Sequence, residues 1–339
     1  MKEYDIMVVG PVSLDHNIDY LGNERKEVGG AVVASGFAAA GSGAKTAIFC
    51  KSNAADADVK ERFAGVNADL YWAASKATCS IRNQYFTADK EKRACTSMGV
   101  CDPFRFEELP QVKTKVYHFA GLVYGDFDGA LLAEAAKHGK VGLDVQCMLR
   151  HVEPDKSMAF HDWAEKKELL PLMDYFKTDA AEAEVLTGLT DRAEAAKMLH
   201  DWGAKEVVIT HNTEVLAYDG DKIYTCPIKA RNLSGRTGRG DTTFAGYIAE
   251  RQQAGVVDVG VGHQHHVDAA RVEGKGGVVD LIAALLQTAV HQDLLSVDLQ
   301  TMAAAGDALI SAVKAQLHGR NSFSYYIWTS IPHLYSFIN

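Results

Sequence analysis

The stretch Gly235–Tyr247, GRTGRGDTTFAGY, contains two glycines that lead directly into an acid and then into a helix-compatible run of small residues. Glycines ahead of a helix let Gly238, Gly240 and their neighbours present backbone N–H groups to an anion at the positive end of the helix dipole. A carboxylate at that point, here Asp241, lies beside the anion and can accept a proton from an attacking hydroxyl. The stretch therefore predicts a site for phosphoryl transfer.

Outward from this stretch, strand-like and helix-like segments alternate, which is typical of a mostly parallel sheet with helices on both faces. The expected strands are residues 5–10, 45–50, 116–120, 141–144, 175–177 and 206–210. The expected helices are residues 29–41, 128–138, 180–187 and 192–202. Two segments interrupt the alternation: the polar residues 17–28, with a strand at Ile18–Leu21, and a hairpin over residues 80–96. Both are expected to project from the main sheet as a lid.

With these features in order, residues 4–252 resemble the ribokinase-like (PfkB) family of carbohydrate and nucleoside kinases. The resemblance implies an α/β fold with a mostly parallel central sheet, helices on both faces and a small β lid. It also implies transfer of phosphate from ATP, with Mg²⁺, to a substrate hydroxyl. We expect residues 1–254 to form the kinase domain, with the lid drawn from about 16–28 and 79–100.

The resemblance assigns roles within the glycine–aspartate stretch. Asp241 matches the catalytic base, and Gly238 and Gly240 match the anion hole. Arg239 stands between the glycines, where the family usually has a small residue. Its amide can still serve the anion hole, and its side chain adds a cation near the phosphates.

The resemblance also assigns residues to the acceptor substrate. Asp15 follows the first strand and matches the acid that hydrogen-bonds substrate hydroxyls, while Gly29 and Gly30 match the glycine pair that lets backbone approach a sugar. The asparagine expected four residues later is Ala34, so part of the usual sugar contact is missing.

A third set of matches concerns the nucleotide and the metal. Asp179-Ala180-Ala181-Glu182 matches an Asn-x-x-Glu motif that helps to order magnesium, its waters and the phosphates. Carboxylates are hard oxygen ligands that suit this ion, and we expect Asp179 and Glu182 to act through water. Thr210 occupies the position of a nucleotide-binding threonine, although Asn212 replaces the glycine of that loop.

Composition limits the partners. The net charge of −9, from 44 acidic and 35 Lys and Arg residues, argues against nucleic acid or an anionic membrane as the main partner. The six cysteines include no CxxC pair, no zinc-type spacing with histidine is found, and no signal peptide is recognisable, so we expect reduced thiols in a cytoplasmic protein. No apolar run approaches the length that spans a bilayer.

Several weaker signals remain. Asp144 and Arg150 follow a strand end, where α/β proteins bind ligands, and are candidates for the site. Arg93 lies in a charge run of the lid hairpin, which is typical of a solvated face. The histidines in residues 262–266 match no closed zinc site and are read as a polar loop. Residues 41–46, GSGAKT, lack the spacing of a Walker A loop.

The composition changes near residue 254. Residues 1–254 contain 68 charged side chains, whereas residues 255–339 contain 11. The family pattern of a further helix and an adenine-contacting loop is not recognisable in this atypical C-terminal segment. It is either a divergent folded continuation or an altered reading of the gene, and in the second case the nucleotide site is incomplete.

The leading hypothesis is an ATP-dependent carbohydrate kinase whose acceptor is a sugar or sugar-like molecule. A nucleoside kinase of the same fold is the first alternative. A non-catalytic relative that binds a sugar or nucleotide is the second, and the departures at Ala34, at Asn212 and in the atypical C-terminal segment favour it. By analogy with the family, exposed strand edges of the lid favour a homodimer.

Overall fold

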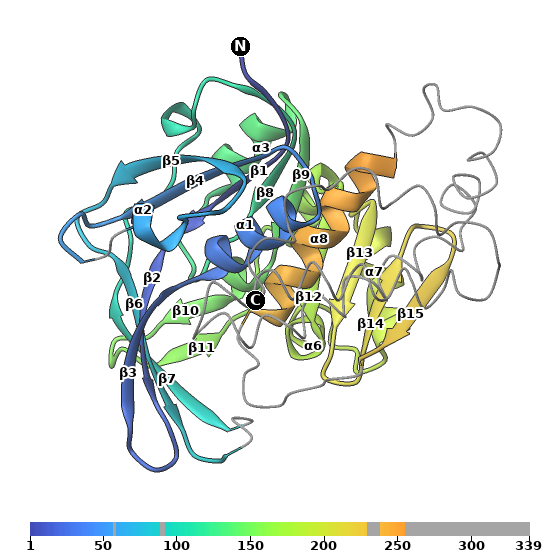
Figure 1. The fold of residues 1–339 in the computed structure, drawn as a ribbon. Coiled ribbons are helices and arrows are strands. Elements are labelled where there is room, and N and C mark those ends of the chain that lie inside the picture. Colours follow the sequence, from blue (N-terminus) through green and yellow to red (C-terminus); the bar gives the residue numbers. More distant parts are fainter. Residues whose placement is uncertain (57–58, 89–91, 229–237, 255–339) are drawn as a thin grey trace, which may run out of the picture.

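The computed structural model of the 339-residue chain describes residues 1–56, 59–88, 92–228 and 238–254 (Figure 1). The atypical C-terminal segment 255–339 lies outside the described residues, and so do the histidines of 262–266, which were expected in a polar loop, and residues 89–91 of the expected hairpin.

A nine-stranded sheet forms the centre of the molecule, in the order β15-β14-β13-β12-β9-β8-β1-β4-β5. All neighbours from β13 to β5 are parallel, and β14 and β15 form an antiparallel edge. Its strands are β1 (Glu3–Pro11), β4 (Thr46–Ser52), β5 (Ala68–Ala74), β8 (Lys113–Phe119), β9 (Lys140–Asp144), β12 (Tyr175–Asp179), β13 (Glu206–Thr210), β14 (Glu214–Tyr218) and β15 (Ile223–Pro227).

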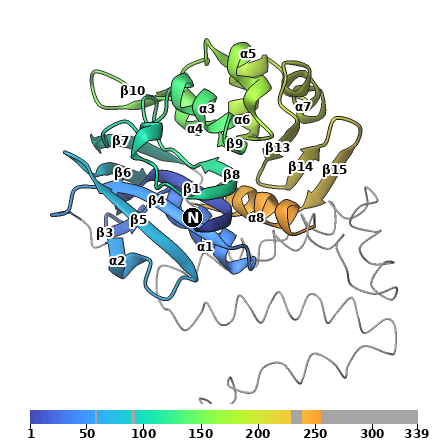
Figure 2. The ribbon, with the colours of Figure 1, turned by 90° about the horizontal axis from the view of Figure 1, so that it is seen from above.

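Helices cover both faces of this sheet, as Figure 2 shows. On β1, Ile6 and Val8 point to one hydrophobic core while Met7 and Val9 point to the other, which is the period-2 alternation of a strand buried on both sides. One face is covered by α1 (Ala31–Gly41) and α8 (Arg239–Ala254), and the other by α3 (Gly129–Ala136), α6 (Ala180–Thr187) and α7 (Arg192–Asp201).

The strand order reverses at β1. The chain passes from β1 to β4 and β5 on one side, and later from β8 through β9, β12 and β13 on the other. Open α/β sheets bind ligands outside the carboxyl ends of the strands at such a switch point. The carboxyl ends of β9, β12 and β13 place Asp144, Asp179 and Thr210 at one edge of the sheet.

A separate four-stranded sheet forms the lid, in the order β3-β2-β6-β7 (Figure 1). Its strands are β2 (Ser13–Ile18), β3 (Glu24–Gly29), β6 (Cys79–Tyr85) and β7 (Arg93–Gly99). The expected lid and the antiparallel pairing of its later hairpin are confirmed. The expected strand at Ile18–Leu21 is wrong in its bounds. The strand β2 ends at Ile18, and a turn in which the Asp19 carboxylate accepts backbone hydrogen bonds follows. The polar strands around this turn lack the apolar alternation that predicts a strand.

Short elements complete the described fold, and one of them links the main sheet to the lid. The hairpin of β10 and β11 meets β7 through a bridge between Ser157 and Thr96. The short elements are α2 (Val59–Arg62), η1 (Phe106–Glu108), α4 (Gln146–Leu149), β10 (Arg150–Val152), β11 (Met158–Phe160), α5 (Lys166–Leu169) and η2 (Leu170–Leu172).

Candidate active site

The glycine–aspartate stretch begins α8, as its sequence predicts. Gly238 has a φ of 85°, a conformation that L side chains rarely adopt, and its carbonyl accepts the first helical bond from Thr242 at 2.9 Å. The first N–H groups of a helix have no partner within it, which makes a helix start a common place for anions. The anion hole at Gly238, Arg239 and Gly240 stays a prediction.

Asp241 lies at this helix start among charged neighbours. Burial, and then the negative charge of Asp144, raise the pKa of Asp241 to about 6, although Lys177 and Arg150 act in the opposite direction. Its carboxylate is therefore mostly ionised at neutral pH and can accept a proton. The backbone carbonyl of Asp241 also accepts a hydrogen bond from the Ser35 hydroxyl on α1, at 3.4 Å.

A buried ion pair lies next to Asp241. The Lys177 ammonium donates to both carboxylate oxygens of Asp144, at 3.2 and 3.0 Å, and lies 3.9 Å from a carboxylate oxygen of Glu182. All three side chains are almost fully buried, with 5% of Lys177, 2% of Asp144 and 1% of Glu182 exposed. Burial raises the pKa of Glu182, against the lowering effect of Lys177.

Asp179 and Glu182 form a reciprocal cap at the start of α6. The Glu182 N–H donates to the Asp179 side chain at 2.8 Å, and the Asp179 N–H donates to the Glu182 side chain at 2.7 Å. This cap gives the motif a structural role independent of metal. No group of three or more His, Cys, Asp and Glu side chains within the described residues is arranged to hold a metal ion. Of the pair, only Asp179 lines the pocket beside α8, and Glu182 is 1% exposed. Magnesium held largely by water and phosphate oxygens, with one carboxylate, fits this arrangement.

Asp15 lies on β2 at the junction of lid and sheet. It accepts a hydrogen bond from the Ser13 hydroxyl at 2.8 Å, and a β-carbon added to Gly29 would lie 3.4 Å from one of its carboxylate oxygens. Burial raises the pKa of Asp15 to about 6, and Ser13, Arg93 and Arg150 each act to lower it. Asp15 therefore lies in a partly desolvated place with cations nearby.

The glycine pair after β3 has a steric explanation. Gly30 has a φ of 106°, and a β-carbon there would lie 2.9 Å from the carbonyl oxygen of Pro11. Gly30 also precedes the first residue of α1, so a second helix begins beside the acceptor region. The lack of a side chain brings β3 close to the end of β1.

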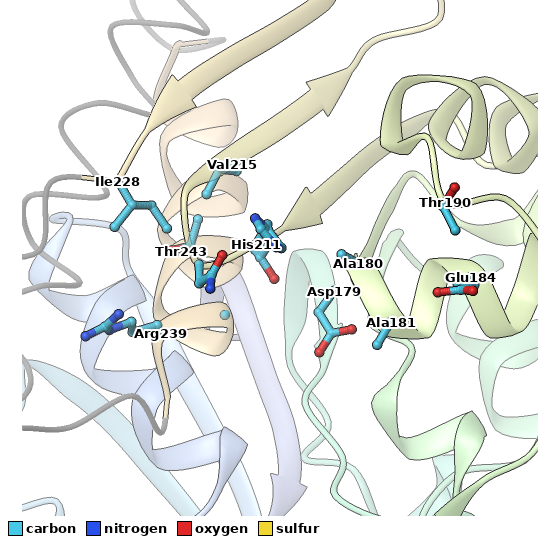
Figure 3. A pocket seen from close by; sticks show the side chains of 13 residues that line it. Asp179, Ala180, Ala181, Glu184, Thr190, His211, Val215, Ile228, Arg239 and Thr243 are labelled. Atoms are coloured by element: carbon cyan, nitrogen blue, oxygen red, sulfur yellow. The ribbon is translucent and has the colours of Figure 1, made fainter. Parts of the chain in front are cut away.

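A pocket of about 510 Å³ opens beside the start of α8, where Arg239 and Gly240 line it. Figure 3 shows Arg239 and Thr243 on the first turns of α8 and Asp179 at the start of α6 as parts of its wall. The remaining lining residues are Ala180, Ala181, Glu184, Thr190, Thr210, His211, Asn212, Val215, Ile228 and Gly240. Thr210, Arg239, Gly240 and Asp179, which the sequence assigned to the donor side, thus share one cavity.

Two buried residues near the start of α8 had no role in the sequence analysis. Lys177 had no assigned role, and its only local signal is a lysine within an otherwise buried strand. His118 is fully buried on β8, and its Nε2 atom lies 3.1 Å from the Ser35 hydroxyl oxygen. Burial lowers the pKa of His118 to about 4. Nothing local in the sequence relates His118 to the start of α8.

None of the described helices is both long and apolar enough to cross a membrane.

Comparison with known proteins gives a family match over most of the chain. The sequence profile of the pfkB family carbohydrate kinase matches residues 5–258. A curated relative, the cytidine kinase of Thermococcus kodakarensis, is 37% identical over 86 residues. That match covers 24% of this chain and 31% of the relative, so the chain matches about a third of the relative's length.

Solved structures match over a larger part of the chain. A pyrophosphate-dependent kinase in the ribokinase family, complexed with a pyrophosphate analog and myo-inositol, is 26% identical, with a TM-score of 0.70 over 84% of this chain and 94% of that one. The Arabidopsis thaliana ribokinase complexed with ribose and ATP has a TM-score of 0.62 over 91% of this chain and 99% of that one. Its identity of 15% supports the fold alone.

Proposed function

This chain belongs to the pfkB family of carbohydrate kinases, and we propose that it transfers the γ-phosphate of ATP to a hydroxyl group of a sugar or sugar-like substrate. One observation carries the proposal. Asp241 lies in the first turn of α8, directly after Gly240, which lines the donor-side pocket, and the charge of Arg150 acts on the carboxylates of both Asp241 and Asp15. A base beside an anion hole, at the junction of two binding regions, is the arrangement that phosphoryl transfer requires.

In the proposed reaction, Asp15 and the backbone at Gly29 and Gly30 hold the acceptor. Asp241 takes the proton of the attacked hydroxyl as its oxygen bonds to the γ-phosphorus, and the bond from that phosphorus to the bridging oxygen breaks, releasing ADP. The N–H groups at Arg239 and Gly240 stabilise charge on the transferring group. Most of the rate enhancement would come from positioning and from these fixed dipoles.

Magnesium would be held near Asp179 and Glu182, through water and the phosphates of the donor. Bound there, the ion would neutralise charge on the phosphate oxygens. Because one oxygen of each carboxylate already accepts a backbone N–H in the α6 cap, the cap would fix the orientation of both groups.

Two observations favour narrower alternatives. The stretch that is 37% identical to a cytidine kinase favours a nucleoside acceptor.

The Arg239 side chain in the wall of the donor-side pocket, together with the likeness to a pyrophosphate-dependent kinase, favours pyrophosphate as the donor. An arginine adds a charge-assisted contact to a phosphate and needs no nucleobase.

The test is product formation by the purified full-length chain with magnesium, using ATP or pyrophosphate as donor. The acceptor panel contains sugars, cyclitols and nucleosides, and Asp241→Asn is the control. Acceptor-dependent release of ADP or phosphate that disappears in the control supports the proposal and identifies the substrates. A folded protein that binds a panel member without turnover would instead be the non-catalytic relative.

A further inference from the structure

Lys177 is a buried cation at the donor end of the site, and packing alone does not explain it. Only 5% of the residue is exposed, and its strand neighbours Tyr175 and Phe176 are buried hydrophobic residues. Removing an ammonium group from water costs several kcal/mol unless charged partners offset the loss. The position of Lys177 therefore depends on the groups around it.

Those groups are mostly carboxylates close to the ammonium. Asp144 is its hydrogen-bond acceptor among the described residues, through both carboxylate oxygens, and Glu182 lies beyond hydrogen-bond distance at 3.9 Å. An ammonium group has three N–H donors, so Asp144 leaves at least one for another acceptor.

The ammonium also lies against the anion hole. A β-carbon added to Gly240 would lie 3.0 Å from Lys177 Nζ and 3.2 Å from Cε. The same β-carbon would lie 3.7 Å from the Thr210 hydroxyl, and Thr210 and Gly240 both line the donor-side pocket. Gly240 thus lacks a side chain where its β-carbon would press against the Lys177 ammonium.

We propose that Lys177 is a further catalytic residue, whose ammonium contacts an oxygen of the donor phosphates at the anion hole. The inference rests on the proposed function. Lys177 keeps its proton throughout, while the proton of the acceptor hydroxyl goes to Asp241 and the bridging oxygen leaves with the shorter phosphate. The ammonium offsets the negative charge of Asp144, Glu182 and Asp241, which would otherwise repel a phosphate.

A second buried lysine supplies a matched control. Lys51 is 2% exposed on β4, where it donates to a carboxylate oxygen of Glu108 at 2.6 Å and to the Pro103 carbonyl at 2.9 Å. It belongs to neither the anion hole nor the pocket. Lys51→Met therefore reports what the loss of a buried lysine does to stability alone.

The experiment measures binding of magnesium-ATP and magnesium-pyrophosphate by calorimetry, and turnover where the wild type shows it. The variants are Lys177→Met, Lys177→Arg and Lys51→Met. We expect Lys177→Met to weaken donor binding about tenfold or more and to lower turnover about a hundredfold. Lys177→Arg should recover part of the binding, and Lys51→Met should bind as the wild type does.

Lys177→Met leaves Asp144 without its partner, so the double variant Lys177→Met/Asp144→Asn is measured if the single variant unfolds. Donor binding by either variant equal to that of the wild type would overturn the proposal, as would a wild type that binds neither donor. If the wild type binds a donor but phosphorylates no acceptor, the proposed function fails, while the binding comparison still decides the role of Lys177.

Discussion

The two ends of the site are built from different kinds of structure. At the donor end, Asp144, Lys177 and Glu182 come from β9, β12 and α6, and all three are almost fully buried. At the acceptor end, Asp15 lies on a lid strand that is largely half-buried, paired with the partly exposed β3. Charged groups that are buried together interact strongly, because little water screens them. The interaction between charged groups close to water is weaker.

This difference teaches how one fold can serve several substrates. The buried positive and negative charges at the donor end offset one another. Replacing one of these residues therefore leaves the others without part of their compensating charge. Residues of the lid strands can vary with little effect on that balance. We therefore expect donor-end variants to change the rate of the chemical step, and acceptor-end variants to change mainly the binding of the acceptor.

The largest effect is expected at the donor end, from Asp241→Asn. The amide keeps the shape of the carboxylate but cannot take the hydroxyl proton, so kcat should fall about a thousandfold. The donor dissociation constant should stay near that of the wild type. At neutral pH the variant should also unfold less readily, because a buried carboxylate with a raised pKa destabilises the folded state increasingly as pH rises above its unfolded pKa, and fully above the raised one. Near-normal turnover would remove Asp241 from the mechanism.

At the acceptor end, Asp15→Asn should raise the KM for the acceptor about tenfold or more and change kcat less. The reason is the loss of a charged hydrogen-bond acceptor for substrate hydroxyls. Asp19→Asn is the matched control, since Asp19 is a carboxylate of the same hairpin that only holds a turn. Equal kinetics for the two variants would show that Asp15 does not contact the acceptor.

The pH dependence should distinguish the two ends again. Burial raises the pKa of both Asp15 and Asp241 to about 6, so each loses its charge as pH falls through that value. Because kcat/KM reports the free enzyme, it should fall more steeply below pH 6 than kcat, in which bound hydroxyls keep Asp15 ionised. Rate profiles from pH 5 to 8 would measure this. Parallel profiles for the two constants would contradict the assignment of Asp15.

The smallest effect is expected from the α6 cap. Asp179→Ala removes the side chain that accepts from the Glu182 N–H, which should lower the free energy of unfolding by about 1 kcal/mol. Asp191→Ala removes the corresponding cap of α7, a side chain that does not line the pocket, and should cost about the same. Only Asp179→Ala should also raise the magnesium concentration needed for half-maximal rate. The same magnesium dependence in both variants would leave Asp179 a structural role alone.

Much of the fold follows from local patterns. The apolar runs of β1, β8, β9, β12 and β13 predict buried parallel strands, because a strand covered on both faces needs no polar alternation. The lid strands β2 and β3 were harder to predict, since their polar and half-buried residues carry a weak periodic signal. The edge strands β14 and β15 form an antiparallel extension that no motif predicted.

By itself, the sequence determined the helix start at Gly238–Asp241 and the glycine pair before α1, whereas the cap formed by Asp179 and Glu182 was recognised only in the structure. The helix start and the glycine pair depend on residues a few positions apart, so their chemistry can be read locally. Only the tertiary structure decided that Lys177 lies against Gly240, and that Asp144 from β9 pairs with it. Those contacts join segments far apart in the chain, and they arise because parallel strands bring their carboxyl ends to one edge of the sheet.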